Sequence, residues 1–244
     1  MRFRPYYVFF FHIYFLFMKF YLYIRPVLSY DGLENPTIRG NQMKKTEIWN
    51  SAEKVWETAA EEILRLKDSL SREAFCQTVK KIAGCRGRII TCGAGTSGAA
   101  AKKIAHSLSC VERPSFYLNP ADAVHGALGS VQPGDLAILI SKGGGTAELV
   151  RLLPAFKAKK IGLIVATENP DSPLGRESDI LLNVKVLKEA DTMNMLATTS
   201  TMAVTAVFDA VCITLMKETN YTRDQFALIH PGGAVGKRLT EGLQ

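Results

Sequence analysis

Five short segments rich in apolar residues alternate with stretches of helical pattern, and this alternation limits the possible folds of the chain more than any other feature. The segments are residues 88–92, 115–119, 135–141, 161–167 and 179–184. Apolar residues that follow one another without polar alternation are typical of strands buried on both faces. Strands that alternate with helices form parallel sheets with right-handed crossovers. We therefore predict an α/β protein, a three-layer α-β-α sandwich around a five-stranded parallel sheet.

Two amphipathic helices are expected before the first strand. Apolar residues from Ile48 to Leu66 recur at spacings of three and four, and a second helix is predicted over 71–83. The pair suggests an arm for packing or dimerisation. Further helices are predicted over about 97–108, 146–158 and 199–217. The last is apolar on every side, which is typical of a central, buried helix. Only a closing loop is expected from Pro231 onward.

The first 42 residues differ from the rest, since 12 of the 22 aromatic residues fall within residues 3–23. The apolar run Tyr6–Met18 is shorter than the roughly 20 residues of a membrane span, and no signal-cleavage site follows it. Three interpretations remain open. Residues 1–42 are not part of the working protein and Met43 is its start, or they form a membrane anchor or interfacial segment, or they pack on the domain. The predicted organisation is an atypical segment, 1–42, and one domain, 43–244.

Charge and cysteine content exclude several classes of protein. Residues 43–244 carry 25 Lys and Arg against 21 Asp and Glu, a balance that suits a small anionic ligand and disfavours nucleic acid as a partner. The five cysteines are odd in number and include no CxxC pair. This pattern predicts reduced thiols in the core of a cytoplasmic protein and no metal site.

Two glycine-rich loops follow predicted strands, at the edge of the sheet where parallel α/β proteins bind ligands. The first, 93–98, has the form G-x-G-x-x-G, but the acid that a dinucleotide site requires after the next strand is missing, which disfavours an NAD-dependent enzyme. The second, 141–146, combines glycine amides and hydroxyls at a helix start. Two such loops on adjacent strands suit one phosphate group.

Hydroxyl-bearing residues also open the apolar helix, at 198–201, and one of them is expected to cap it. The others are candidates to face the same phosphate. The predicted phosphate-binding residues are Thr96, Ser97, Ser141, Lys142, Gly143, Gly144, Thr146, Thr199 and Ser200.

Two acids and two histidines are candidates for proton transfer. Glu148 falls in the first turn of the helix after the second loop, where it would also stabilise the helix dipole. Glu189 follows the last strand and so lies near the ligand edge. His125 precedes Gly126, and His230 precedes a proline, which holds its backbone extended. Each histidine has a structural role as its alternative.

The motifs GAGTSG, AVHGALG, ISKGGGTAEL, VLKEA…ATTST and FALIHPGGAVGKRL follow one another in an order that resembles the sugar isomerase (SIS) domain family over about residues 45–240. The chain is most similar to the D-arabinose-5-phosphate isomerase branch, in a short form without CBS domains. The resemblance implies the sandwich fold described above and interconversion of an aldose and a ketose phosphate without metal or cofactor. It also implies a homodimer or homotetramer with active sites between subunits.

The resemblance assigns phosphate-loop positions to Ser97, Ser141 and Thr146, and catalytic positions to Glu148, Glu189 and His230. His125 matches the histidine of an HG motif. The chain departs from the family where Thr96 replaces a catalytic lysine, and where Lys142, Gly143 and Gly145 alter the second loop. Asp191-Thr192 also replaces Cys-Pro after Glu189-Ala190.

An isomerase of this class needs a base that moves a proton between adjacent carbons through an enediol, and groups that move protons on the oxygens. Glu189 is the predicted carbon base and His230, from a neighbouring subunit, the predicted oxygen acid/base, with Glu148 and His125 in support. Lys142 is a candidate to replace the charge lost at Thr96. The alternatives are a non-catalytic sugar-phosphate sensor and an isomerase of a different ketose phosphate.

Overall fold

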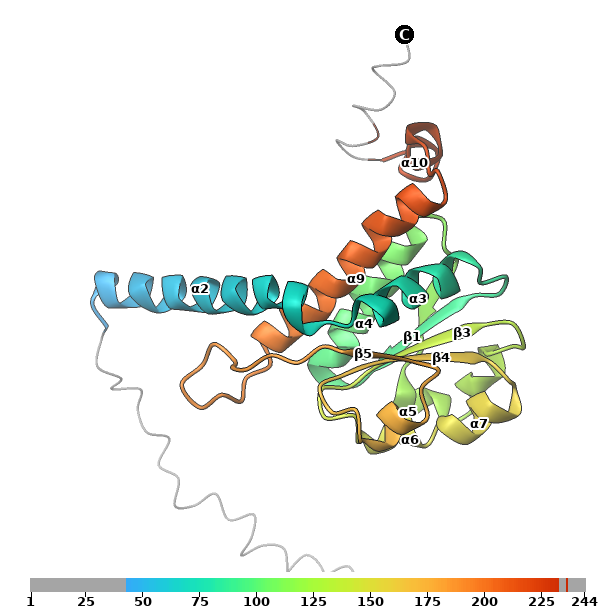
Figure 1. Ribbon diagram of the computed structural model, residues 1–244, viewed down its shortest axis with the longest axis horizontal. Coiled ribbons are helices and arrows are strands. Elements are labelled where there is room, and N and C mark those ends of the chain that lie inside the picture. Colours follow the sequence, from blue (N-terminus) through green and yellow to red (C-terminus); the bar gives the residue numbers. More distant parts are fainter. Residues whose placement is uncertain (1–42, 233–235, 237–244) are drawn as a thin grey trace, which may run out of the picture. The chain divides into compact units, whose positions relative to one another are not determined.

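The computed structural model describes residues 43–232 and residue 236, and its centre is a five-stranded sheet (Figure 1). The strands are β1 (Ile89–Gly93), β2 (Ser115–Tyr117), β3 (Leu136–Ile140), β4 (Gly162–Thr167) and β5 (Ile180–Asn183). Every pair of neighbours is parallel. The predicted fold class, number of strands and strand direction are confirmed.

The strand order, β2-β1-β3-β4-β5, places a topological switch point between β1 and β3. Ile89 of β1 pairs with Ser115 of β2 on one side and with Leu136 of β3 on the other. Since the chain winds away from this point in both directions, a crevice opens beyond the carboxyl ends of the two strands. The two glycine-rich loops begin at these ends.

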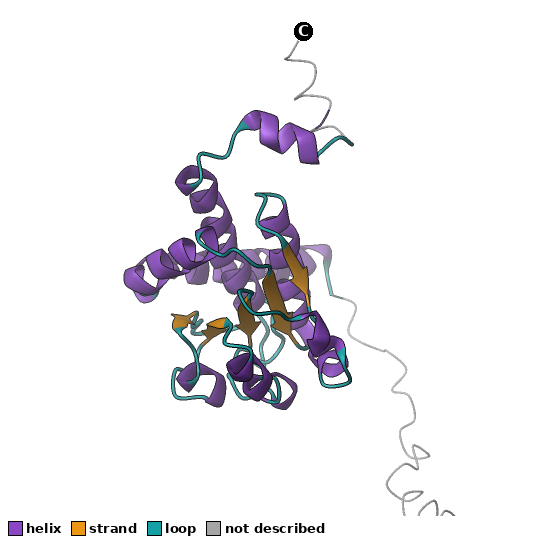
Figure 2. Cartoon of the chain, turned by 90° about the vertical axis from the view of Figure 1, so that its right-hand side faces the viewer, coloured by secondary structure: helices purple, strands orange, loops and turns teal. Residues whose placement is uncertain are grey.

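Helices cover both faces of the sheet (Figure 2). One face carries α3 (Arg72–Ala83), α4 (Gly95–Ser109) and α9 (Thr199–Glu218), and the other carries α5 (Pro120–Ala123), α6 (Ala147–Val150), α7 (Leu153–Ala158) and α8 (Pro173–Arg176). Ile138 of β3 packs on the first side and Leu139 on the second, and both are 0% exposed. Burial on both faces is the physical reason for the continuous apolar segments.

The helix α9 meets the length and composition of a membrane span, yet it belongs to the core of the sandwich. Its buried residues, Phe208 and Val211 among them, pack in the same cluster as those of α3 and α4. The prediction that it is buried on every side is only partly right, because Met202 is 38% and Ile213 is 58% exposed.

One prediction about a helix is wrong, and one helix was missed. The helix expected over 146–158 is two short helices, α6 and α7, and Pro154, which has no N–H to donate, lies in the first turn of the second one. The chain before Pro231 forms α10 (Arg223–Ile229), which was not expected; Thr222 and Gln225 form its capping box. A short 3-10 helix also spans Ala127–Ser130.

The predicted first helix is α2 (Lys45–Ser69). The chain divides into two compact units between Trp49 and Asn50, so only the later part of α2 belongs to the unit that contains the sheet. In that part Glu62, 4% exposed, accepts a hydrogen bond from the Leu187 amide at 2.9 Å, and Arg65 donates to the Lys185 carbonyl at 2.7 Å. These contacts attach α2 to the segment after β5. The three interpretations of 1–42 lie outside the described residues.

Candidate functional site

A pocket lies where the ends of β3, β4 and β5 meet the starts of α4 and α9. Its polar lining comes from hydroxyl-bearing residues and one lysine: Thr96, Ser97, Lys142, Thr167, Ser200 and Thr201. Among the described residues that line the pocket, Lys142 is the one charged side chain. The pocket therefore combines hydroxyls and one ammonium with an apolar lining of Ile140, Ala166, Val184, Ala197 and Val204.

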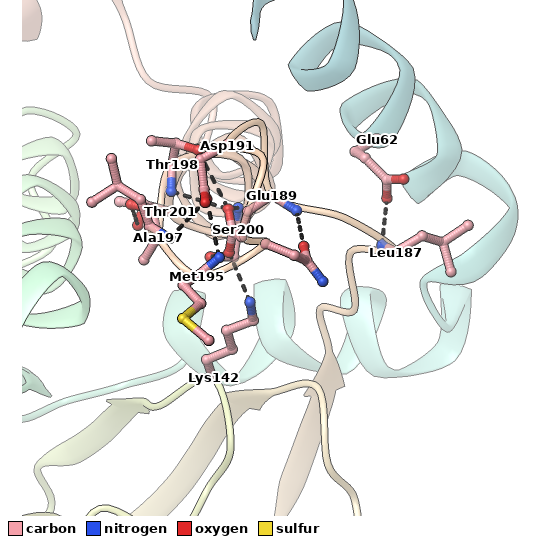
Figure 3. Close-up of polar contacts among 12 residues, drawn as sticks. Glu62, Lys142, Leu187, Glu189, Asp191, Met195, Ala197, Thr198, Ser200 and Thr201 are labelled. Carbon is pink, nitrogen blue, oxygen red and sulfur yellow. Dashed lines mark hydrogen bonds and ion pairs between the residues drawn. The ribbon is translucent and has the colours of Figure 1, made fainter. Parts of the chain in front are cut away.

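Glu189, in the segment between β5 and α9, anchors two of the lining residues (Figure 3). Its side chain is 0% exposed. One carboxylate oxygen, Oε1, accepts hydrogen bonds from Lys142 Nζ at 2.7 Å and from the Ser200 hydroxyl. The other, Oε2, accepts from the amides of Thr198 at 3.0 Å and Ser200 at 3.2 Å. Lys142 lies in loop two, and Thr198 and Ser200 lie at the start of α9, so the carboxylate joins loop two to the start of α9.

The hydrogen bonds to Glu189 decide its protonation state. Burial by itself would raise the pKa of a carboxyl group. The Lys142 ammonium, the Ser200 hydroxyl and the two backbone amides outweigh that effect and lower the pKa of Glu189 to about 2. Glu189 is therefore an ionised acceptor in this conformation, with both oxygens occupied.

The same carboxylate corrects the expectation that a Ser or Thr side chain caps α9. Thr198 occupies the N-cap position, but its side chain makes no capping hydrogen bond. Glu189 takes over that function across nine residues of chain, and a carboxylate is favoured at this end of the helix dipole.

Lys142 is held at both ends. Its carbonyl accepts hydrogen bonds from the Glu168 amide and the Thr167 hydroxyl, each at 2.9 Å, while its ammonium pairs with Glu189. The side chain is nevertheless 40% exposed. A fixed backbone and a partly exposed side chain let the ammonium reach the pocket.

The second glycine-rich loop is closed on itself in this structure. The hydroxyls of Ser141 and Thr146 are hydrogen bonded to each other at 2.8 Å, and Ser141 Oγ also accepts from the Gly144 amide at 3.1 Å. Gly144 has a φ of 68°, and a Cβ there would lie 2.0 Å from Ser172 Oγ. Its neighbour Gly143 has open space around it. Ser141 and Thr146 thus lie beside the pocket rather than in its lining.

The first glycine-rich loop separates this pocket from a second recess. Gly93 and Gly98 pack backbone against backbone, since a Cβ on Gly98 would lie 2.7 Å from the Gly93 carbonyl. Lys102, Tyr117 and Glu148 line the second recess. The predicted residues are therefore divided between two recesses, one on each side of loop one.

The remaining predicted residues lie elsewhere. Thr199 is 0% exposed, and its hydroxyl, buried in α9, has no hydrogen-bond partner. His125 is exposed in the loop after α5. His230 is the C-cap residue of α10, which lies beyond the C-terminal end of α9 (Figure 1), whereas Ser200 lies at the start of α9. The His230 ring stacks on Phe226 with centroids 3.9 Å apart. A helix of the length of α9 spans about 30 Å, so one copy of the chain does not bring His230 to the pocket.

Three residues at these two recesses were missed from the sequence. Thr167 fixes the backbone of Lys142, Tyr117 donates a hydrogen bond to the Gly93 carbonyl at 2.8 Å, and the Lys102 ammonium lies 5.1 Å from the Tyr117 ring centroid. Thr167 and Tyr117 are the last residues of β4 and β2, and Lys102 lies in α4. Their location at the carboxyl edge of the sheet was the sequence signal that could have identified them.

Comparison with known proteins places the chain in a family. Residues 81–213 match the SIS domain model. The chain belongs to the SIS domain family. The predicted resemblance is thereby confirmed, including the branch to which the chain is most similar, as the proteins below indicate.

Among the curated relatives of this SIS protein, the arabinose 5-phosphate isomerase KdsD of Shigella flexneri is 37% identical over 178 residues, which are 73% of this chain and 54% of the relative. KdsD of Pseudomonas aeruginosa is 39% identical over 165 residues, 68% of this chain and 51% of the relative. The chain thus spans about half the length of these relatives.

Two solved structures are covered in full by this chain. A Listeria monocytogenes protein, whose name proposes a sugar-phosphate isomerase, is 54% identical with a TM-score of 0.77, and the match covers 78% of this chain and 100% of that one. An Escherichia coli CFT073 protein in complex with A5P is 32% identical with a TM-score of 0.75 and the same coverage.

The substitution Gly144→Ala tests the geometry of loop two. It should lower the free energy of unfolding by about 1–3 kcal/mol, because alanine is strained at this φ and its Cβ meets Ser172. Gly145→Ala is the matched control, since its Cβ meets nothing within 4 Å, and its effect should stay within about 0.5 kcal/mol. Urea unfolding of both variants measures the difference. Equal effects would contradict this account of the loop.

Acid unfolding tests the role of Glu189. Because its folded-state pKa is lowered from 4.5 to about 2, its contribution to stability is complete above about pH 4.5 and is lost as the pH falls toward 2. Glu189→Gln should therefore lower stability at pH 7 and flatten the loss of stability between pH 4.5 and 2.5 in urea unfolding. Glu61→Gln, at an exposed ion pair, is the control and should follow the parent curve. A Glu189→Gln curve parallel to the parent curve would refute the assignment.

Proposed function

We propose that this protein is a sugar-phosphate isomerase that interconverts an aldose and a ketose phosphate, of the D-arabinose 5-phosphate and D-ribulose 5-phosphate type. The observation that carries the proposal is the pocket at the switch point, where one ammonium and several hydroxyls converge beside a buried carboxylate. The KdsD relatives and the A5P complex support the substrate class.

The phosphate group binds at the glycine-rich loops in this proposal. Thr96 and Ser97 lie in the first turn of α4, whose N-cap residue Ala94 makes no side-chain capping bond. Amides at a helix start favour an anion. Ser141, Thr146 and the amides of Gly143 and Gly144 take part once the Ser141–Thr146 hydrogen bond opens toward the ligand. Anchoring the phosphate orients the reacting carbons at the other end of the sugar.

The reaction moves a proton between C1 and C2 through an enediol. Glu189 remains the proposed carbon base, which requires that the substrate displace one of the donors that occupy its oxygens. The Ser200 hydroxyl lies within reach of the same carboxylate and can stabilise charge on the substrate oxygens. Glu148, in the neighbouring recess, and His125 are proposed to support proton movement.

The position of His230 supports an active site shared between subunits. Its place near the far end of α9 from Ser200 means that an oxygen acid/base at this residue must come from a second copy of the chain. We therefore propose a homodimer or homotetramer with active sites between subunits, working in the cytoplasm. The cysteines fit a reducing compartment, although only Cys92 and Cys212 are buried, so the expectation of core thiols holds for these two.

Isomerisation is tested by NMR of the full chain with D-ribulose 5-phosphate in D₂O. We expect aldose anomeric signals to appear, with deuterium at C2, because the enediol exchanges its proton with solvent. A panel of other ketose phosphates tests the alternative substrates. Binding without new signals for any of them would reject the isomerase and favour the sensor.

The shared site is tested by mixing two variants. Glu189→Gln and His230→Ala should each reduce turnover by about 10²-fold or more, as expected for lost proton-transfer groups. If each site takes Glu189 from one copy and His230 from another, co-refolded mixtures should recover a substantial part of the parent activity. The homogeneous variants, treated identically, are the controls. Mixtures no more active than their average would refute sharing.

A further inference from the structure

Lys142 lies between two negative charges once a sugar phosphate is bound. The first is Glu189, ionised and 0% exposed, which the ammonium contacts at 2.7 Å. The second is the phosphate group of the ligand, which carries a charge of about −1.5 to −2 at pH 7. Since Lys142 is the one charged side chain among the described residues lining the pocket, it is the cation on which both anions act.

The carboxylate of Glu189 remains hydrogen bonded when Lys142 leaves it. The Ser200 hydroxyl stays on Oε1, and the amides of Thr198 and Ser200 stay on Oε2. The side chain of Lys142 is 40% exposed, and Gly143 next to it leaves open space. The ammonium is thus the donor that can leave, and the remaining donors belong to Thr198 and Ser200 at the start of α9.

We propose that Lys142 exchanges partners: Glu189 positions its ammonium in the ligand-free protein, and the phosphate group of the sugar phosphate takes the ammonium when it binds. This inference rests on the proposed function. Its consequence is that substrate binding frees one position on Glu189 Oε1, next to the reacting carbons. Binding of the correct ligand therefore prepares the base, and Glu189 competes with phosphate for Lys142 until then.

If Glu189 and phosphate compete for Lys142, substitutions at Lys142 and at Glu189 should change the affinity for phosphate in opposite directions. Lys142→Gln keeps a hydrogen-bond donor for Glu189 but removes the charge, and should weaken binding of both inorganic phosphate and D-ribulose 5-phosphate by about 10- to 100-fold. Glu189→Gln removes the competing anion and should strengthen binding of inorganic phosphate, although it lowers turnover. A permanent structural ion pair predicts no gain in affinity from Glu189→Gln.

The experiment is calorimetric titration of the full chain and its variants with inorganic phosphate and with D-ribulose 5-phosphate. Lys157→Ala, an exposed lysine of α7, is the control and should bind as the parent does. Lys142→Arg keeps the charge and should bind closer to the parent than Lys142→Gln does. Melting temperatures verify that each variant is folded, and the Lys142→Gln and Lys142→Arg pair decides the question if Glu189→Gln does not fold.

Two outcomes overturn the inference: parent-like affinity in Lys142→Gln, or no gain in affinity for inorganic phosphate in a folded Glu189→Gln. These outcomes are distinct from failure of the proposed function. If the parent isomerises sugar phosphates and Lys142→Gln binds them unchanged, only the inference fails. If affinity depends on Lys142 but no ketose phosphate is isomerised, the partner exchange stands as a property of a sensor and the isomerase is rejected.

Discussion

The carboxylate of Glu189 is the constraint on which the arrangement of this site depends. Burying an ionised carboxylate costs several kcal/mol unless it is paired and hydrogen bonded. Here the compensation comes from Lys142, 47 residues earlier, and from Thr198 and Ser200, 9 and 11 residues later. The Glu189 hydrogen bonds therefore fix three segments relative to one another: the end of β3, the segment after β5 and the start of α9. The pocket lining follows from this, because two of the donors, Lys142 and Ser200, are also pocket residues.

Most of the fold was predictable because its determinants are local. The five apolar segments became the five strands, since burial on both faces leaves no place for polar alternation. The errors arose where a local signal was overlooked or overruled. Pro154 interrupts a helix that its apolar pattern would have continued, and the Thr222–Gln225 capping box that begins α10 was visible in the sequence.

The site was less predictable because its geometry comes from contacts distant in sequence. The residue types at the strand ends pointed to one edge of the sheet, and Lys142, Ser97 and Ser200 do lie in one pocket there. Nothing local shows that Thr199 is buried, that Glu189 caps α9, or that Gly93 and Gly98 pack so closely that loop one divides the candidate residues between two recesses. The hydroxyl cluster 198–201 favoured a local cap, and a carboxylate from another segment took its place.

The candidate phosphate-binding residues and the candidate histidines lie in different parts of one chain, which links phosphate binding to proton transfer in the proposed reaction. One copy of the chain contains a pocket with the Lys142 ammonium and the ionised Glu189 carboxylate, but the two candidate histidines lie elsewhere: His125 in an exposed loop and His230 stacked on Phe226 after α10. In the proposed isomerase, one copy would bind the phosphate and a second copy would supply the oxygen acid/base. If Lys142 leaves Glu189 only when phosphate binds, the base is also unavailable until the ligand arrives. An empty site would then have neither a free base nor, without its neighbour, an acid, which confines proton abstraction to the assembled, occupied site.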